Sequence, residues 1–382
     1  EIGSKEYGMD HLDLYKEETY HFVDSLLDEY IGGENPVFIG PDVHIGTDEY
    51  NKKEAEQYRY FTDRYLKYIE KYGKTPRMWG GLKWLPGKTP VKAEGVTVNA
   101  WSYDWVDPEV SLKDGYKLIN TCDTYLYIVP GAGYYREFLD HQWLYETWTP
   151  WMINRKQTLP EGTPGVLGGM FAVWNDYIGN GITFKDIHHR AYPAMQTLSL
   201  KMWTGAVDDL SFARFDSCRR ALSEAPGVNI GAKVKTMDGK VLQVSKLKRN
   251  QKLLIEEVGY DYEVAFDFTA KSADKGSVLF KSSNAILYQS SPKSGKLAFW
   301  SDGYLNEFDY MFPIGQRVQI VIKGDHTSTS LYIDGKLHQT LDKKILYKIG
   351  EEVVYYQSTL VFPLAFTGNF SGQLLNLKVL QK

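Results

Sequence analysis

Two adjacent carboxylates, Asp48 and Glu49, directly follow a short strand-like segment at 43–46. Aromatic and polar side chains end or follow the other strand-like segments of the same half of the chain: Trp79, Trp101, Tyr125, Tyr127, Trp174 and Asp176. Two neighbouring carboxyl groups in a Trp-lined pocket suit cleavage of a glycosidic bond, because one must stay protonated to donate to the leaving oxygen while the other stays ionised. Burial against the rings is expected to separate the two pKa values.

Each of these residues also has an ordinary explanation. Exposed carboxylates are usually solvated surface, and neighbouring side chains of a regular strand point to opposite faces, so both acids reach one pocket only if the backbone bends at the strand end. Trp79, Trp101 and Trp174 are singly typical of core packing. Their coincidence at one edge favours a sugar site. A non-catalytic glycan-binding protein could use the same groove without needing an acid beside Asp48, and this alternative stays open.

The segments that carry these residues alternate between strand-like and helix-like patterns. Apolar residues at helical spacing predict a helix over 17–31 and another near 53–72, and Thr183 with Asp186 has the spacing of a capping box. Strand-like pieces lie at 43–46, 77–79, 96–101, 116–121 and 166–174. This β-then-α order predicts a parallel sheet covered by helices. If the strands belong to a (β/α)8 barrel, the candidate residues meet at its C-terminal face.

The alternation stops at Pro226 and Gly227, which mark a linker. Beyond it, period-two patterns at 262–268, 319–322 and 330–333, with the hairpin signal Asp334-Gly335, predict an all-β sandwich. We therefore predict two domains, a portion of a TIM barrel over 1–224 and a β-sandwich over 230–382.

Composition excludes several classes of protein. Lys and Arg number 44 against 48 Asp and Glu, a formal charge of −4, and no long basic run exists, so nucleic acid is not an expected partner. No apolar run approaches the ~20 residues that span a bilayer. Cys122 and Cys218 lie far apart and fit no disulfide framework or zinc site. Because nucleotide-binding and metalloprotease motifs are also absent from the sequence, neither a cofactor nor a metal is expected.

The stretch His44-Ile45-Gly46-Thr47-Asp48-Glu49-Tyr50 resembles the H-x-G-x-D-E signature of glycoside hydrolase family 20, the β-N-acetylhexosaminidases and lacto-N-biosidases. Further segments resemble that family in order: 77–80 its fifth barrel strand, 98–101 its sixth and 168–176 its eighth. The likeness covers roughly 5–205. The region after 230 resembles concanavalin-like or laminin-G-like jelly-roll sandwiches, notably at 331–336. Such modules bind glycans or pack on the catalytic domain, and packing is the role we favour.

The resemblance implies a retaining hydrolase that releases terminal β-linked N-acetylhexosamine from glycans by substrate-assisted catalysis. The sugar's own 2-acetamido oxygen attacks C1, giving an oxazolinium intermediate. Carried over, Glu49 is the general acid and then base, and Asp48 orients the acetamido group and stabilises the oxazolinium charge. Tyr125 hydrogen-bonds the acetamido oxygen. The remaining candidates would line the pocket and bind the sugar: Trp79, Trp101, Tyr127, Trp174 and Asp176.

Several features depart from the family pattern. Tyr127 stands where many members have the Asp of a Tyr-x-Asp segment, and Asp176 stands where exo-acting members often have Glu. The shorter Asp176 side chain leaves room for a longer sugar, so release of a disaccharide, as by lacto-N-biosidases, is an open alternative. Only strands four to eight of the barrel can be counted, so the N-terminal half of the barrel is expected as a partner from a longer chain. The family is commonly secreted or surface-attached, which implies an extracellular or cell-surface location.

Overall fold

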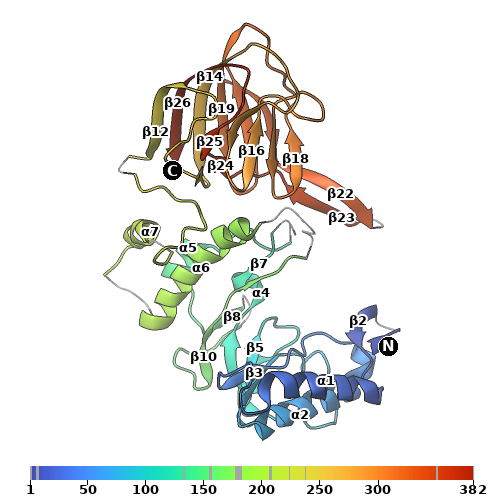
Figure 1. Ribbon diagram of the computed structural model, residues 1–382. Coiled ribbons are helices and arrows are strands. Elements are labelled where there is room, and N and C mark those ends of the chain that lie inside the picture. Colours follow the sequence, from blue (N-terminus) through green and yellow to red (C-terminus); the bar gives the residue numbers. More distant parts are fainter. Residues whose placement is uncertain are drawn as a thin grey trace. The chain divides into compact units, whose positions relative to one another are not determined.

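The computed structural model describes residues 2–5, 8–130, 132, 134–154, 157–176, 183–205, 209–222, 224–236, 238–349 and 352–381 (Figure 1). The chain divides into two compact units. Unit 1 comprises Glu1–Val129, Tyr134–Trp174 and Ala194–Ala213, and unit 2 comprises Pro130–Gly133, Asn175–Pro193 and Arg214–Lys382. Within the described ranges, every helix is too short or too polar to cross a membrane.

A five-stranded parallel sheet forms the centre of unit 1, in the spatial order β10-β6-β5-β4-β3. Its strands are β3 (Asp42–His44), β4 (Thr75–Trp79), β5 (Thr97–Ala100), β6 (Lys117–Asn120) and β10 (Val166–Gly169). All five fall on the predicted strand-like pieces, so the predicted parallel sheet is confirmed. The edge strand β3 pairs only with β4 within the described part of the chain.

The predicted strand at 166–174 is wrong as a single element. It consists of β10 and, after a break, β11 (Ala172–Val173), which pairs in parallel with β7 (Tyr127–Ile128) in a separate sheet. The break follows an irregular pairing register between Val166 and Gly168, where Gly168 has a φ of 151° that other residues avoid. Two short antiparallel pairs complete the strands of unit 1: β1 (Gly3–Ser4) with β2 (Gly8–Leu12), and β8 (Met152–Asn154) with β9 (Gln157–Thr158).

Helices accompany the parallel strands along the chain. The helix α1 (Glu17–Ile31) has the predicted bounds, and η1 (Lys52–Glu54) leads into α2 (Ala55–Lys71). The capping box of α6 is confirmed, because Thr183 N donates to Asp186 Oδ2 at 3.1 Å and Asp186 N donates to Thr183 Oγ1 at 3.2 Å. The other helices are α3 (Pro108–Lys113), α4 (Asp123–Leu126), α5 (His141–Glu146), α6 (Phe184–Thr204) and α7 (Phe212–Ala221). The division between the units falls inside α6, after Pro193.

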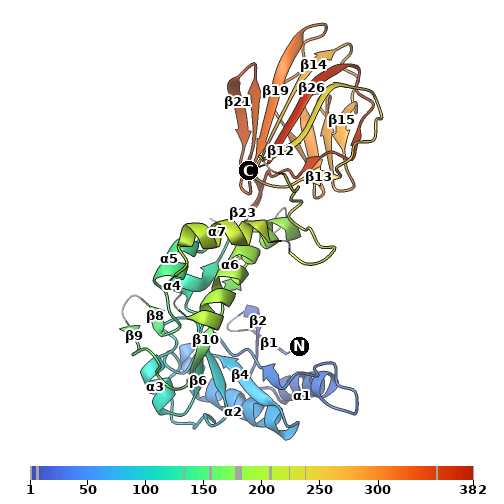
Figure 2. The same ribbon diagram turned by 90° about the vertical axis from the view of Figure 1, so that its left-hand side faces the viewer.

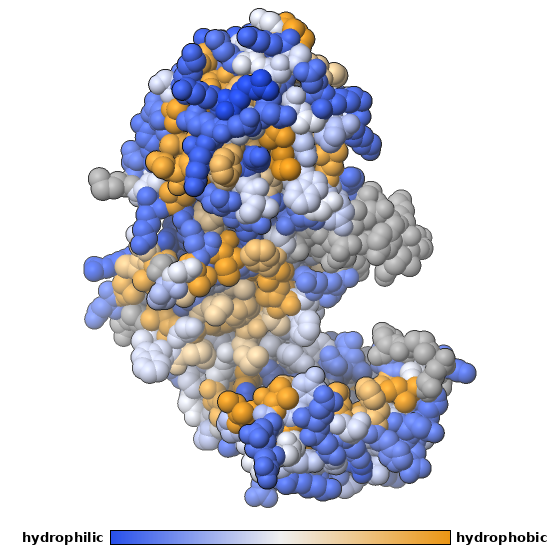
Figure 3. Space-filling view, viewed as in Figure 1, coloured by the Kyte–Doolittle hydropathy of each residue, from blue (hydrophilic) through white to orange (hydrophobic). Residues whose placement is uncertain are grey.

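The core of unit 1 is divided among four separate clusters of buried side chains. One cluster places Leu66 of α2 against Met78, Val98 and Leu118 of the sheet. Large apolar side chains nevertheless stay exposed on α1 and before β3: Phe22, Leu26, Val37, Phe38 and Ile39. Figure 3 shows separate orange patches among blue and white side chains in this part of the unit. Unit 1 therefore presents apolar surface next to its edge strand.

Unit 2 contains two facing antiparallel sheets (Figure 2). The larger sheet has the order β12-β26-β14-β19-β20-β21, and the smaller has the order β18-β17-β16-β15-β25. The larger comprises β12 (Lys240–Leu247), β14 (Tyr262–Ala270), β19 (Arg317–Gly324), β20 (Thr329–Ile333), β21 (Lys336–Leu341) and β26 (Gly372–Gln381). The smaller comprises β15 (Val278–Lys281), β16 (Ala285–Tyr288), β17 (Ala298–Ser301), β18 (Tyr304–Glu307) and β25 (Phe366–Thr367). Two more pairs flank them: β13 (Glu257–Val258) with β24 (Phe362–Pro363), and β22 (Lys343–Ile349) with β23 (Glu352–Gln357).

The inward faces of the two sheets form one continuous core. Along β14 the buried and half-buried residues alternate, so that Phe266 packs edge to face on Phe280 of the other sheet, with ring centroids 5.6 Å apart. The predicted hairpin between β20 and β21 is confirmed, since Asp334 and Gly335 both have positive φ, as a tight hairpin turn needs. Strand β26 lies inside the larger sheet, where Leu374 is in register with both Leu247 and Phe268.

Candidate active site

The candidate residues of unit 1 lie at one edge of the parallel sheet. Asp48 and Glu49 follow β3, Trp79 ends β4 and Trp101 follows β5. Because parallel strands run in the same direction, their carboxyl ends lie at the same edge. The strand-end placement predicted from the sequence is therefore observed.

The backbone bends sharply after β3. Gly46 and Thr47 have φ values of 78° and 62°, in the left-handed region, where a residue with a Cβ costs about 1–2 kcal/mol. Two hydrogen bonds hold the bend: Trp79 N donates to Gly46 O at 2.9 Å, and the buried Tyr58 hydroxyl donates to Thr47 O at 2.6 Å. This is the bend that the sequence requires if both acids are to reach one pocket.

The loop that follows β4 packs directly on this bend. A Cβ added to Gly81 would lie 2.4 Å from the Tyr58 hydroxyl and 3.0 Å from Asp48 O. Neither approach is sterically acceptable without movement, and the Asp48 carbonyl belongs to the backbone. Position 81 therefore requires glycine so that the loop can contact the segment carrying the acids.

Both acids line a hollow of about 680 Å³. Its walls come from α1, α2, the segment 11–14 and the bend, and they are largely apolar: Leu12, Leu14, Phe22, Val23, Leu26, Leu27, Tyr30, Phe38, Val43, Ile45, Tyr50, Tyr58, Phe61 and Tyr65. The side chains of Asp48 and Glu49 are exposed. The expectation that the acids are buried against aromatic rings is therefore wrong for the described residues, because they follow the edge strand of the sheet, beside an open hollow.

An aromatic cluster forms beside the acids. Trp174 lies 5.9 Å from Trp79 and 5.8 Å from Tyr127, and His44 lies 5.4 Å from Trp79, all measured between ring centroids. Burial is the main cause of the raised pKa of Tyr127, and the negative charges of Asp123 and Asp48 add to it. The structure thus brings Trp79, Tyr127 and Trp174 together, within the electrostatic influence of Asp48.

His44 stands between the cluster and the bend. Surrounding protein atoms lower its pKa by disfavouring the charged ring, although the side chain still reaches solvent, and the nearby Asp48 charge opposes this effect. Gly46 N donates a hydrogen bond to Nδ1 of His44 at 3.0 Å. A neutral imidazole can accept this bond, so His44 acts as a further support of the backbone turn.

The other predicted site residues occupy different surroundings. Trp101 donates from Nε1 to Gly80 O at 2.7 Å. Tyr125 is buried against Trp143, with ring centroids 4.7 Å apart, in a core cluster that does not include Trp79. Asp176 is exposed and belongs to unit 2. The substrate contacts assigned to Tyr125 and Asp176 stay predictions.

Several residues that shape the site were not singled out from the sequence. The Tyr135 ring contacts Tyr127 at 5.5 Å, and its hydroxyl donates to Asp123 Oδ2 at 3.0 Å. Tyr58 was recognisable only as part of a helix with apolar periodicity, which indicates core packing and says nothing of a hydroxyl that holds the bend. No local pattern marks either tyrosine.

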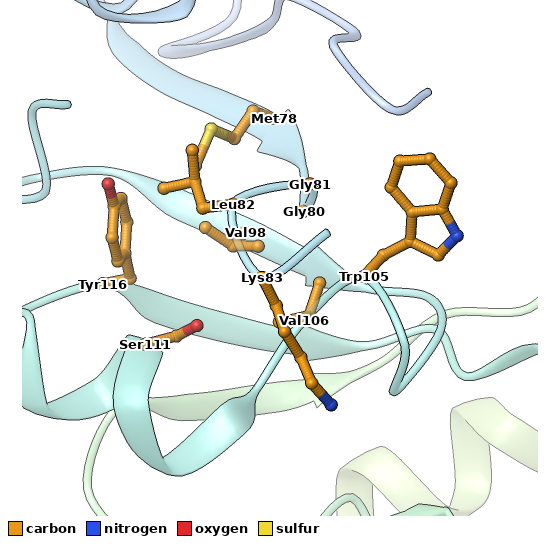
Figure 4. A pocket seen from close by; sticks show the side chains of 10 residues that line it. All are labelled: Met78, Gly80, Gly81, Leu82, Lys83, Val98, Trp105, Val106, Ser111 and Tyr116. Atoms are coloured by element: carbon orange, nitrogen blue, oxygen red, sulfur yellow. The ribbon is translucent and has the colours of Figure 1, made fainter. Parts of the chain in front are cut away.

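A small cavity lies behind the ends of β4 and β5 (Figure 4). It measures about 20 Å³, which is room for about one water molecule. Its walls are Met78, Gly80, Gly81, Leu82, Lys83, Val98, Trp105, Val106, Ser111 and Tyr116. A sugar ring does not fit there, whereas the larger hollow, which Asp48 and Glu49 line, has room for one. In the described ranges, no group of three or more His, Cys, Asp or Glu side chains is placed to hold a metal.

Comparison with known proteins gives one family. The model of the glycosyl hydrolase family 20 catalytic domain matches residues 3–206, more than half of the 382 residues. Among curated proteins, none matches the chain.

Solved structures similar to the chain include two β-N-acetylhexosaminidases. The enzyme from Bacteroides fragilis NCTC 9343 is 22% identical, with 55% of this chain and 44% of that chain covered and a TM-score of 0.41. The family 20 enzyme from Streptomyces coelicolor A3(2) is 19% identical, with 56% and 42% covered and a TM-score of 0.40. The chain spans about half the length of the solved structures it matches.

Proposed function

The chain belongs to glycosyl hydrolase family 20, and from this premise we propose that the protein hydrolyses glycans, releasing terminal β-linked N-acetylhexosamine. The observation that carries the proposal is the bend at Gly46 and Thr47, which lets Asp48 and Glu49 line the same hollow. The neighbouring rings of Trp79 and Trp174 offer the flat apolar faces on which sugars pack.

In the proposed mechanism the substrate supplies its own nucleophile. The 2-acetamido oxygen attacks C1 while Glu49 gives its proton to the glycosidic oxygen, and the leaving group departs as an oxazolinium ring forms. Glu49, now a carboxylate, takes a proton from the water that attacks C1 and reopens the ring. Asp48 orients the acetamido group and stabilises the positive charge of the intermediate. Because C1 is inverted twice, the anomeric configuration is retained.

The rest of the pocket is assigned by the same proposal. Tyr125 hydrogen-bonds the acetamido oxygen, which requires its ring to reach the pocket from the position beside Trp143. Asp176 binds hydroxyl groups of the terminal sugar. The walls are formed by Trp79, Trp101, Tyr127 and Trp174. No cofactor and no metal take part.

We also propose that the parallel sheet is an arc of a (β/α)8 barrel, its strands β3, β4, β5, β6 and β10 being the fourth to the eighth. Two observations support this: β3 has an open edge within the described residues, and an apolar hollow lies beside it. Strands from the N-terminal half of the barrel would pair with that edge and fill part of the hollow. We further propose that the sandwich over 230–382 is a jelly roll and that the protein is located outside the cell or at its surface.

The proposal is tested with Glu49→Gln in the full-length protein. We expect kcat on a β-N-acetylglucosaminide with a poor leaving group to fall by about 10²–10⁴-fold, because proton donation is lost. Sugar binding, measured by calorimetry, should survive. The control is Glu34→Gln, which alters an exposed carboxylate of the loop before β3.

The mechanism is tested with the substrate. A matching 2-hydroxy glycoside should be almost inert, since it has no acetamido group to close the ring, and NMR of the first product should show a retained anomer. Ordinary activity of Glu49→Gln would overturn the assignment of the acid. Binding without any hydrolysis by the wild-type protein would show a glycan-binding protein instead.

A further inference from the structure

A row of three tryptophans leads away from the candidate site. Trp105 lies 5.4 Å from Trp101 and 5.2 Å from Trp84 between ring centroids, with interplanar angles of 32° and 35°. Trp101 follows β5 and is anchored to the Gly80 carbonyl. Trp84 is 39% exposed. The row therefore connects the strand ends with open surface through continuous aromatic contacts.

The exposed end of the row lies against the segment that carries the proposed acid. Lys52 follows Glu49 by three residues, and its Nζ lies 4.7 Å from the centroid of the Trp84 ring. The loop that carries Trp84 also begins at Gly81, which approaches the Asp48 backbone. Because a general acid protonates the leaving oxygen, groups on the Glu49 segment are suited to meet the part of the substrate that leaves.

The loop that presents Trp84 is held in place on both sides. Glu56 accepts hydrogen bonds from Lys88 N at 2.6 Å and Thr89 N at 2.8 Å, and Arg59 Nε donates to Thr89 O at 2.6 Å. On the other side, Lys83 N donates to Trp105 O at 3.1 Å. An exposed tryptophan on a fixed loop is a preformed surface, which loses little conformational entropy when a ligand binds.

Positive charge borders the same rings. Nζ of Lys83 lies 3.4 Å from the centroid of the Tyr103 ring, as Lys52 lies over Trp84. Neither lysine takes part in an ion pair between described residues. Glu54 is a carboxylate close to Lys52 in the sequence, but it accepts a hydrogen bond from the Tyr15 hydroxyl. The Lys83 ammonium also donates a hydrogen bond to Tyr103 O, so we assign the contact with a negatively charged ligand to the Lys52 ammonium.

We propose that Trp84 and Trp105 bind the leaving-group portion of an acidic glycan, and that Lys52 contacts its carboxylate or sulfate. The proposal rests on the proposed function, since Glu49 as proton donor defines the leaving-group side. A sugar ring that stacks on Trp84 displaces the Lys52 ammonium, whose contact with the ring is weak at an exposed site. The flexible lysine stem then keeps the ammonium within reach of the acidic substituent.

The test compares substrates in the full-length protein. Three β-N-acetylglucosaminides are used, with methanol, glucose or glucuronate as the leaving group. Trp84→Ala should lower the ratio of kcat/KM for the glucuronate substrate to kcat/KM for the methyl glycoside by about tenfold, the equivalent of ~1.4 kcal/mol. Lys52→Met, which keeps an apolar stem, should lower the ratio of glucuronate to glucose substrates by about fivefold. The controls are Trp203→Ala, a side chain 90% exposed on α6, and Lys113→Met, an exposed lysine of α3.

The outcomes separate this proposal from the proposed function. If Trp84→Ala lowers kcat/KM equally for all three substrates, Trp84 has a structural role, and the proposal that it binds the leaving group is overturned. An unchanged glucuronate-to-glucose ratio in Lys52→Met would overturn the preference for acidic glycans. If the wild-type protein hydrolyses none of the substrates, the proposed function fails. Binding by Trp84 is then measured by quenching of tryptophan fluorescence with the glucuronate disaccharide. The wild-type protein should bind this disaccharide about tenfold more tightly than Trp84→Ala does. Equal affinity would refute the proposal.

Discussion

The two units bury their apolar side chains in different ways. The sandwich of unit 2 gathers its buried side chains into one cluster between two sheets. Unit 1 divides its core into four clusters and leaves Phe22, Leu26 and Phe38 exposed beside the hollow that holds the proposed acids. Packing is most complete in unit 2, whereas the candidate active site lies in unit 1 where packing is interrupted. A site that must admit a ligand needs such an interruption.

The largest expected effect compares two phenylalanines. Phe266→Ala in unit 2 should lower the free energy of unfolding by about 3–5 kcal/mol, because a 1% exposed ring is replaced by a cavity. Phe22→Ala in unit 1 should change it by less than about 0.5 kcal/mol in the 382-residue chain, because that ring is 49% exposed. Urea denaturation measures both. If the cost of Phe22→Ala rises to a core value in a longer chain, the comparison is sharpened, because the Phe22 ring is then covered. Similar costs for Phe22→Ala and Phe266→Ala in the 382-residue chain would break it.

A second prediction makes unit 2 the more acid-sensitive unit. Burial lowers the pKa of His189 from 6.5 to about 4, helped by His326, Arg190 and Lys233. Because the unfolded state then binds the proton more readily, stability falls as the pH drops from about 6.5 through 4, by about 2–3 kcal/mol. Unfolding monitored across this range should lose the dependence in His189→Phe, which keeps a ring against Tyr260. The exposed His21 of α1 provides the control variant His21→Gln.

Unit 1 contains a contrasting group. Hydrogen bonds from Thr89 and from the Lys88 backbone lower the pKa of Glu56 from 4.5 to about 2. Its contribution to stability is therefore present above about pH 4.5 and is lost only as the pH falls through about 2. If the loop anchored by Glu56 unfolds at a higher pH than the sandwich does, the comparison is contradicted. Fluorescence of Trp84 reports on that loop.

A change in stability smaller than those expected for Phe266→Ala and for protonation of His189 concerns the bend. Tyr58→Phe removes the hydroxyl that donates to Thr47 O and should cost about 1 kcal/mol. Its effect on kcat should exceed its effect on KM, because Asp48 then loses its fixed direction. Tyr60→Phe, a half-exposed ring on the same helix, is the matched control. If Tyr58→Phe keeps the wild-type kcat, the bend is held by its backbone hydrogen bonds alone.

Sequence patterns predicted the elements whose signals are local. The helix at Glu17–Ile31, the Thr183–Asp186 capping box and the Asp334-Gly335 hairpin were each readable because a few neighbouring side chains determine them. The helices α4, α5 and α7 were not predicted. Two of them are shorter than two helical turns, so no apolar period can be seen in the sequence.

The site was only partly readable for a different reason. The sequence places Asp48 and Glu49 after a strand. Their exposure depends on whether another strand covers the open edge of β3, and no pattern within 43–50 encodes that. The left-handed conformation of Thr47 is equally hidden, because threonine disfavours it and tertiary contacts from Tyr58 stabilise it. Strand ends could be predicted, whereas the contacts that orient their side chains could not.

The position of β26 inside the larger sheet has a consequence during synthesis of the protein. Leu247 and Phe268 emerge from the ribosome long before Leu374, yet both lie opposite it in the finished sheet. Among the described strands, β12 pairs with β26 alone, so until β26 is made β12 lacks a partner in the sheet and β14 keeps one open, apolar-faced edge. More than a hundred residues must be translated between β14 and β26, which takes on the order of ten seconds at the usual rates. During this time the incomplete sandwich is prone to pair with other chains. Slowing translation after β14 should lengthen this interval, whereas a chaperone that covers strand edges should protect the chain while it lasts.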